Sequence, residues 1–307
     1  MQISTKNIEN EKARNYYSKS GLMTDVEKYA DELIVLSPDI GQLCELIHGL
    51  LIHYQTGDLY GVQLPATRMD EVRTRFVSRI FDNILRLNPR PLTIVRFPQE
   101  RHIGCCRDFA TLLCSLLRLK GRPARVRVGF ANYVEPTTDV YCDHWITEYW
   151  SDTALKWVQV DPQQDTVLRE HNQLAFDPLD IPDNQFVLAG VAWLLCRRGY
   201  GSPTRYGYGP TETGMWIIRN NLLHDMASLN KIEMTPWDSW GFSDQPYEDL
   251  TEEMLSKLDA AAELTIAVDD SFTQTRTFYE RETYFRVPAK VTSYTLRDER
   301  TTAVIYE

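Results

Sequence analysis

The sequence predicts an α+β protein, and three observations that follow one another along the chain support this class. Apolar residues recur at helical spacing through about the first hundred residues. One amphipathic helix is then expected from Cys106 to Leu119, and the segments after it alternate between apolar and polar residues as β-strands do. Helices followed by a run of neighbouring strands are typical of α+β proteins, in which helices cover an antiparallel sheet.

The first part of the chain is expected to be a helical lead-in. The run "TDVE", Thr24 to Glu27, has the form of a capping box that opens a helix towards Leu36. Apolar residues at helical spacing predict a second helix over residues 43–54 and a third over residues 72–87, which ends at "NPRP".

The middle of the chain is expected to pair one helix with three strands. The helix over residues 106–119 carries its leucines on one face, and Gly121 and Pro123 form its stop signal. The strands are "ARVRVGF", "VYCDHWITEYW" and "KWVQVD". Because the last two are joined by the short turn "SDTAL", the three strands are predicted to form an antiparallel meander.

Residues 1–170 are therefore expected to form one domain of lead-in and core. Residues 171–307 form a C-terminal extension of unassigned role, either separate or part of the same domain. Helices are expected at about residues 185–198, 213–230 and 251–263, and the last forty residues have a β-like composition.

Charge and composition narrow the range of partners. A formal net charge of −10 and a sequence pI near 5.2 argue against nucleic acid or an anionic membrane as the main partner. The N-terminal residues lack the apolar core of a secretory signal, and no apolar run is long enough to span a bilayer, so a cytoplasmic location is expected. The six cysteines are then expected to be reduced thiols. No oligomeric state is indicated.

Three residues on successive elements have the chemistry of a nucleophilic site. Cys106 opens the expected helix, His144 lies in the second strand, and Asp161 ends the third. A helix N-terminus and a neighbouring imidazole both favour the thiolate, His144 would take the thiol proton, and Asp161 would orient the ring. The backbone N–H of Cys106 is a ready oxyanion donor, and Gln99 is a weak candidate for the second.

The same region resembles the core of the transglutaminase-like superfamily. The resemblance rests on "GCCRDFATLLCSLLRLKGRPARVRVGF", "DHWITEYW" and "KWVQVDP", and it covers about residues 95–165. It implies a papain-like α+β fold with Cys106 as nucleophile, His144 as base and Asp161 as orienting acid. Cys105 occupies a position that varies in the family pattern, so its substitution is expected to matter little. Trp145 directly follows His144, where many members have Ala-Trp.

Less specific interpretations were weighed against this one. A zinc site could be drawn from Cys105, Cys106, Cys142 and His144, but the spacing lacks the usual ligand pairs, and neither a metal nor a cofactor is expected. The rival acids Asp143 and Asp165 are expected to be solvated. The aromatic segments at residues 200–208 and 236–242 could wall a cleft, although packing is the commoner role of such residues.

The expected activity is thiol-dependent acyl transfer on an amide bond through a Cys106 thioester. The substrate would be a peptide, a protein or a small amide, and hydrolysis is slightly favoured over transamidation because water needs no second pocket. The alternative is a catalytically silent papain-like scaffold that binds a peptide or protein partner.

Overall fold

The computed structural model describes residues 5–135, 137–297 and 299–306, and these form a mixed α+β architecture, as the sequence predicts. The helices are α1 (Thr5–Tyr17), α2 (Ala30–Leu33), α3 (Ile40–Leu50), α4 (Val77–Leu87), α5 (Cys106–Leu119), α6 (Thr166–His171), α7 (Ala189–Arg197), α8 (Met215–Leu229), α9 (Glu252–Ile266) and α10 (Phe272–Arg281). The strands are β1 (Leu51–His53), β2 (His102–Gly104), β3 (Ala124–Ala131), β4 (Tyr141–Ser151), β5 (Lys156–Val160), β6 (Phe186–Leu188), β7 (Tyr206–Gly209), β8 (Glu212–Thr213), β9 (Asp238–Ser239), β10 (Lys290–Tyr294) and β11 (Arg300–Val304).

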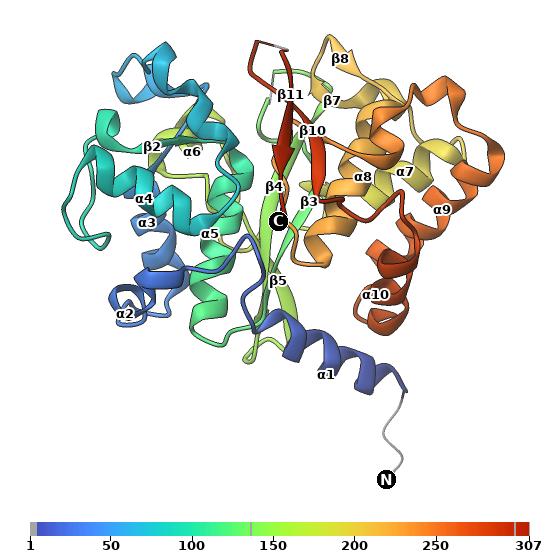
Figure 1. Cartoon of the computed structure of the whole chain (residues 1–307), viewed down its shortest axis with the longest axis horizontal. Helices are drawn as coiled ribbons and strands as arrows, with labels where there is room; N and C mark the ends of the chain where they lie inside the picture. The colour runs from blue at the N-terminus through green and yellow to red at the C-terminus, as the bar shows by residue number, and fades with distance from the viewer. Residues whose placement is uncertain (1–4, 136, 298, 307) are drawn as a thin grey trace.

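A six-stranded sheet runs through the middle of the molecule. Its order is β6-β3-β4-β7-β8, with β5 also paired to β4. Figure 1 shows α3, α4 and α5 on one side of this sheet and α7, α8 and α9 on the other. Two smaller sheets accompany it, a parallel pair β1-β2 and a three-stranded sheet β11-β10-β9.

The predicted helix and the three predicted strands are present at nearly the predicted bounds. β3, β4 and β5 form an antiparallel meander in which Gly129 lies opposite His144 and Thr147 opposite Val160. The second edge of β4 is shared by two partners, because β5 pairs with residues 147–151 and β7 pairs in parallel with residues 141–142. Residues 143–146 therefore lie in the fork between β5 and β7.

The leucine face of α5 builds the core that fixes its position. These side chains are buried with the inward residues of the sheet and of α3 and α4: Leu112, Leu113, Leu116, Leu117, Val126 and Val128 belong to the same cluster. Burying such side chains is worth about 1.5–3 kcal/mol each, so the N-terminus of α5 is held firmly against the sheet.

The lead-in differs from the predictions at three places. The helix predicted to open at Thr24 is a short 3₁₀ turn followed by α2, because Glu27 has φ 50°, which lies outside the helical region. The second predicted helix ends at Leu50, where the chain becomes β1 and pairs with β2. The third is divided: residues 66–73 are 3₁₀-helical, Thr74 and Phe76 are extended, and α4 begins at Val77.

Strands beyond residue 170 join the same sheet as those before it. β6 pairs with β3 and β7 with β4, so the sheet crosses the boundary expected at residue 170. Buried ion pairs add to this connection, because the Arg127 guanidinium binds both carboxylate oxygens of Asp225 on α8. This arrangement favours the alternative in which the extension is part of the same domain.

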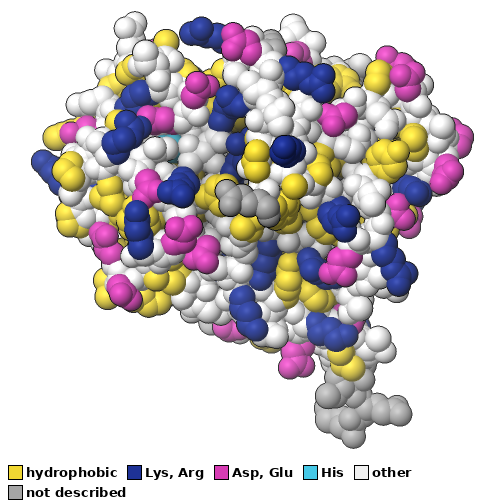
Figure 2. Space-filling model, viewed as in Figure 1, with side chains coloured by type: hydrophobic (Ala, Val, Ile, Leu, Met, Phe, Trp, Pro, Cys, Tyr) yellow, Lys and Arg dark blue, Asp and Glu magenta, His cyan; other side chains and the backbone are white. Residues whose placement is uncertain are grey.

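The extension contains the three predicted helices as α7, α8 and α9, but β6 takes the first residues of the segment predicted as helix 185–198. The β-like character of the last residues corresponds to the antiparallel hairpin β10-β11, and α10 was not predicted. In the described part of the chain, no helix is long and apolar enough to cross a bilayer. Figure 2 shows acidic and basic side chains interspersed over one face.

Candidate active site

Cys106 is the first residue of α5, and the chain before it is shaped to start the helix there. Cys105 is the N-cap residue, and its backbone N–H donates to Asp108 Oδ2 at 2.9 Å. Gly104 makes this possible, because a Cβ at that position would lie 2.9 Å from the same carboxylate oxygen. Asp108 thus has the capping role that its place in the first turn suggests. The Cys106 side chain is largely buried.

His144 and Asp161 meet in the fork of the sheet. His144 Nε2 lies 2.7 Å from Asp161 Oδ2, and both side chains are buried. Asp161 is one residue beyond Val160, so the end of β5 places Asp161 next to β4. Because Nε2 faces Asp161, Nδ1 is the ring nitrogen left for Cys106. The structure thus brings together the three residues that the sequence singled out.

Two residues that the sequence did not indicate hold Asp161 in place. The Tyr133 hydroxyl donates to Oδ2 at 3.0 Å, and the backbone N–H of Gln163 donates to Oδ1 at 3.0 Å. Tyr133 also packs edge-on against the His144 ring, with ring centroids 5.9 Å apart. These contacts fix the carboxylate and, through it, the imidazole.

The surroundings of Cys106 favour its thiolate. A hydrogen bond from the Cys105 thiol is the largest cause, and a hydrogen bond and charge from His144 add to it against the effect of burial, so that the pKa of Cys106 falls to about 6. Burial and the same hydrogen bond raise the pKa of Cys105 well above its ordinary value. Cys105 therefore stays a thiol and stabilises its neighbour, a larger role than the sequence suggested.

His144 is charged in the same range of pH. Burial alone would lower its pKa, but the charge and hydrogen bond of Asp161, together with Cys106, raise the pKa of His144 to about 10. Burial is the largest influence on Asp161 and opposes its ionisation, but the charge and hydrogen bond of His144 together with the hydrogen bonds from Gln163 and Tyr133 exceed it, so the pKa of Asp161 is lowered. Between about pH 6 and pH 10 the pair is thus a thiolate and an imidazolium.

Further side chains surround the three residues. His53 pairs with Gly104 across β1 and β2, and the backbone N–H of the next residue, Tyr54, donates to Gly104 O at 2.9 Å. Burial first, and then the charge of His144, lower the pKa of His53 to about 3, so its ring is neutral. Tyr208 follows the residue of β7 that pairs with Cys142.

Two aromatic pairs are among the side chains around the three candidate catalytic residues. Tyr54 packs edge-on against Trp237 and Tyr208 against Trp216, with ring centroids 5.7 and 5.8 Å apart. Burial first, and then the Coulombic influence of Cys105 and Cys106, raise the pKa of Tyr54. Tyr208 and Trp237 come from the two aromatic segments, residues 200–208 and 236–242, that were candidates for the wall of a cleft.

Three other expectations are corrected or left without support. Gln99 is exposed and lies in the 3₁₀ turn before β2, and nothing in the described part of the chain supports it as an oxyanion donor. Asp165 is half-buried, and its carboxylate accepts from the Leu168 N–H at 3.0 Å, which caps α6, and from the Tyr60 hydroxyl at 2.9 Å. Asp143 is half-buried and bound by Asn221.

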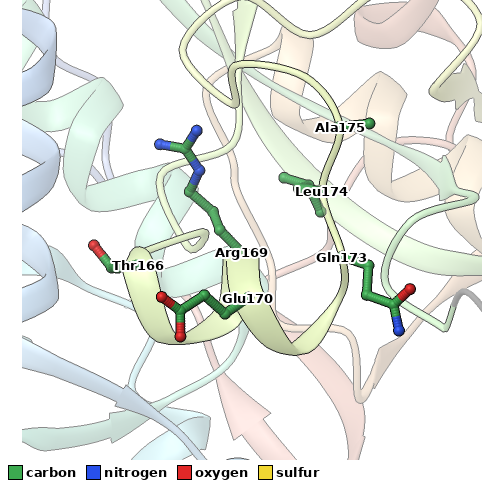
Figure 3. Close-up of a pocket in the computed structure, with 6 residues that line it drawn as sticks. All are labelled: Thr166, Arg169, Glu170, Gln173, Leu174 and Ala175. Carbon is green, nitrogen blue, oxygen red and sulfur yellow. The ribbon is translucent and has the colours of Figure 1, made fainter.

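No metal ligand set is evident in residues 5–135, 137–297 and 299–306, where no group of three or more His, Cys, Asp or Glu side chains is arranged to hold an ion. A hollow beside α6 is lined by Thr166, Arg169, Glu170, Gln173, Leu174 and Ala175 (Figure 3). None of the three candidate catalytic residues lines it.

Comparison with known families agrees with the resemblance seen in the sequence. Residues 66–162 match the family model of the transglutaminase-like superfamily, a segment that includes all three residues of the candidate site. This superfamily comprises cysteine-based acyltransferases and peptidases. Searches of curated proteins and of solved structures found no match.

Proposed function

We propose that the protein is a cysteine enzyme that transfers the acyl group of an amide through a thioester on Cys106, in a papain-like arrangement of helix and sheet. The observation that carries the proposal is the His144–Asp161 pair, at 2.7 Å, beside a thiol whose pKa is lowered to about 6. A buried ion pair of this kind costs desolvation energy, and such perturbed groups cluster at functional sites.

The proposed reaction begins with the Cys106 thiolate attacking the carbonyl carbon of the amide. The new S–C bond pushes one electron pair of the carbonyl onto its oxygen, where the free N–H of Cys106 is a donor. The C–N bond then breaks, and the proton on His144 Nδ1 goes to the departing amine. A thioester remains on Cys106, while Asp161 holds the ring and stabilises its charge.

The acceptor decides between two outcomes. Attack by water completes hydrolysis of a peptide, protein or small amide, and attack by an amine completes transamidation. We favour hydrolysis slightly, because water needs no binding site of its own. In both cases His144 removes a proton from the attacking molecule.

Iodoacetamide labelling tests the proposed nucleophile. Cys106 should be carboxamidomethylated well below the pH at which an ordinary thiol reacts, and the His144→Ala variant should lose this reactivity. Equal and slow labelling of all six cysteines would contradict the proposal.

The alternative is a scaffold that binds a peptide or protein without turnover. It would be preferred if wild type and Cys106→Ser behaved identically on a panel of peptide, amide and thioester substrates while both bound the same partner. The complete set of Cys106, His144 and Asp161 argues against it, because loss of catalysis usually removes one member.

A further inference from the structure

One acidic residue next to the candidate site, Asp143, takes no part in the proposed attack by Cys106 or in the proton transfer by His144. Asp143 directly precedes His144 on β4, in the fork between β5 and β7. Its side chain is half-buried, and Tyr208 of β7 follows the residue paired with Cys142. Asp143 therefore lies where the second half of the chain meets the site.

Asn221 of α8 holds one oxygen of this carboxyl group. Its Nδ2 donates to Asp143 Oδ1 at 2.6 Å and to the carbonyl oxygen of Gly129 at 3.1 Å, and the Asn221 side chain is itself buried. Within the described part of the chain, Oδ2 accepts no hydrogen bond and is not among the enclosed unpaired atoms. One oxygen is thus anchored and the other is free for a ligand.

Asp143 differs in its charge environment from the fully buried carboxylates of the described residues. Every fully buried carboxylate of the described residues lies within ion-pair distance of a lysine, arginine or histidine. Asp143 has no such partner among them. The polar groups around it are Cys106 of α5, His144 of β4, Asn221 of α8, Tyr208 of β7 and Tyr54 after β1.

Among these groups only His144 is cationic, and its charge is already shared by Asp161 and Cys106. Burial first, and then the negative charge of Cys106, raise the pKa of Asp143 to about 8, although the Asn221 hydrogen bond and His144 act in the other direction. Its carboxyl group therefore keeps its proton to a higher pH than an ordinary aspartic acid does. A carboxylic acid kept neutral in this way can donate a hydrogen bond to an oxyanion.

We infer that Asp143 is a catalytic residue whose Oδ2–H donates a hydrogen bond to the carbonyl oxygen of the substrate when Cys106 attacks, with Asn221 as its positioning residue. This inference rests on the proposed acyl transfer and supplies the second oxyanion donor. The bond changes are those already given: S–C forms, the carbonyl electron pair moves to oxygen, and C–N breaks with the proton from His144. The Asp143 proton stays on Asp143 throughout.

The test measures acylation of the enzyme by p-nitrophenyl acetate as the burst of p-nitrophenolate between pH 5 and pH 10. Asp143→Ala should slow the burst by about 10²–10³-fold, which is the usual effect of removing one oxyanion donor. Asp143→Asn keeps a neutral donor in the same place, so its burst should fall by less than about tenfold.

The pH profile separates this role from a structural one. The wild-type burst should decline with an apparent pKa near 8, whereas Asp143→Asn should keep its rate up to pH 10, because p-nitrophenolate leaves without needing the proton of His144. Asn221→Ala should slow the burst and move the decline above pH 8, because the amide hydrogen bond lowers the pKa of Asp143.

Three results would overturn the inference. Asp143→Asn as slow as Asp143→Ala would mean that a charged carboxylate is required. A decline near pH 8 that persists in Asp143→Asn would assign it to another group. A wild-type burst unaffected by Asp143→Ala would remove Asp143 from the reaction while leaving Cys106 acylation intact. Absence of a burst in wild type would instead contradict the proposed function itself.

Discussion

Replacing Cys105 by alanine should make Cys106 a weaker acid. The Cys106 pKa is about 6 against an ordinary 9.0, and since each factor of ten is worth about 1.4 kcal/mol, its thiolate is stabilised by about 4 kcal/mol. Hydrogen bonding from Cys105 is the largest favourable cause. A hydrogen bond to a charged group contributes about 1.5–3 kcal/mol, so the pKa of Cys106 in Cys105→Ala should rise to roughly 7–8.

The assay is the rate of iodoacetamide labelling of Cys106 as a function of pH, read by peptide mass spectrometry. Cys105→Ser is the matched control, because its hydroxyl keeps a donor and its midpoint should lie closer to that of wild type than the midpoint of Cys105→Ala. An identical midpoint in wild type and Cys105→Ala would show that the neighbouring thiol does not stabilise the thiolate.

Two further predictions concern the part of the chain after residue 170. Arg127→Leu leaves Asp225 buried without its cation and should lower the free energy of unfolding by about 3–5 kcal/mol in urea denaturation, whereas Arg198→Leu, which removes an exposed ion pair, should cost under about 1 kcal/mol. Similar losses in both variants would argue against the buried pair as a structural link. Gly207→Ala should lower the melting temperature and slow acylation, because its Cβ would lie 2.1 Å from the carbonyl oxygen of Glu212, whereas Gly209→Ala in the same strand meets nothing within 4 Å. Equal melting temperatures for these two variants would show that the β7-β8 hairpin accommodates the added methyl group without strain.

Local sequence signals were enough to predict the helix and the three strands at the centre of the fold. The helix from Cys106 to Leu119 has a complete apolar face and a stop at Gly121, and β3 to β5 are long enough for their alternation to be clear. The order of Cys106, His144 and Asp161 on these elements was therefore predictable. That the three meet depends on the antiparallel register, which the short turn between β4 and β5 made the simplest arrangement.

The parts of the fold and of the site that could not be predicted depend on contacts between segments far apart in the sequence. β1, β6 and β7 have only three or four residues, too few for a periodic pattern, and β7 pairs with a strand more than fifty residues earlier. Asp143 was expected to be solvated because alternation along β4 separates it from His144. Asn221, 78 residues later in the chain, binds Asp143 instead, and no local sequence pattern predicts that contact.

Transfer of an acyl group through Cys106 can be tested by the mass of the protein and its peptides after brief exposure to p-nitrophenyl acetate. We expect one acetyl group on the peptide that contains Cys106. Hydroxylamine should release it as it releases a thioester, and it should be absent in Cys106→Ala and strongly reduced in His144→Ala. Acetylation that persists in Cys106→Ala, or that is spread evenly over the six cysteines, would contradict acyl transfer through Cys106.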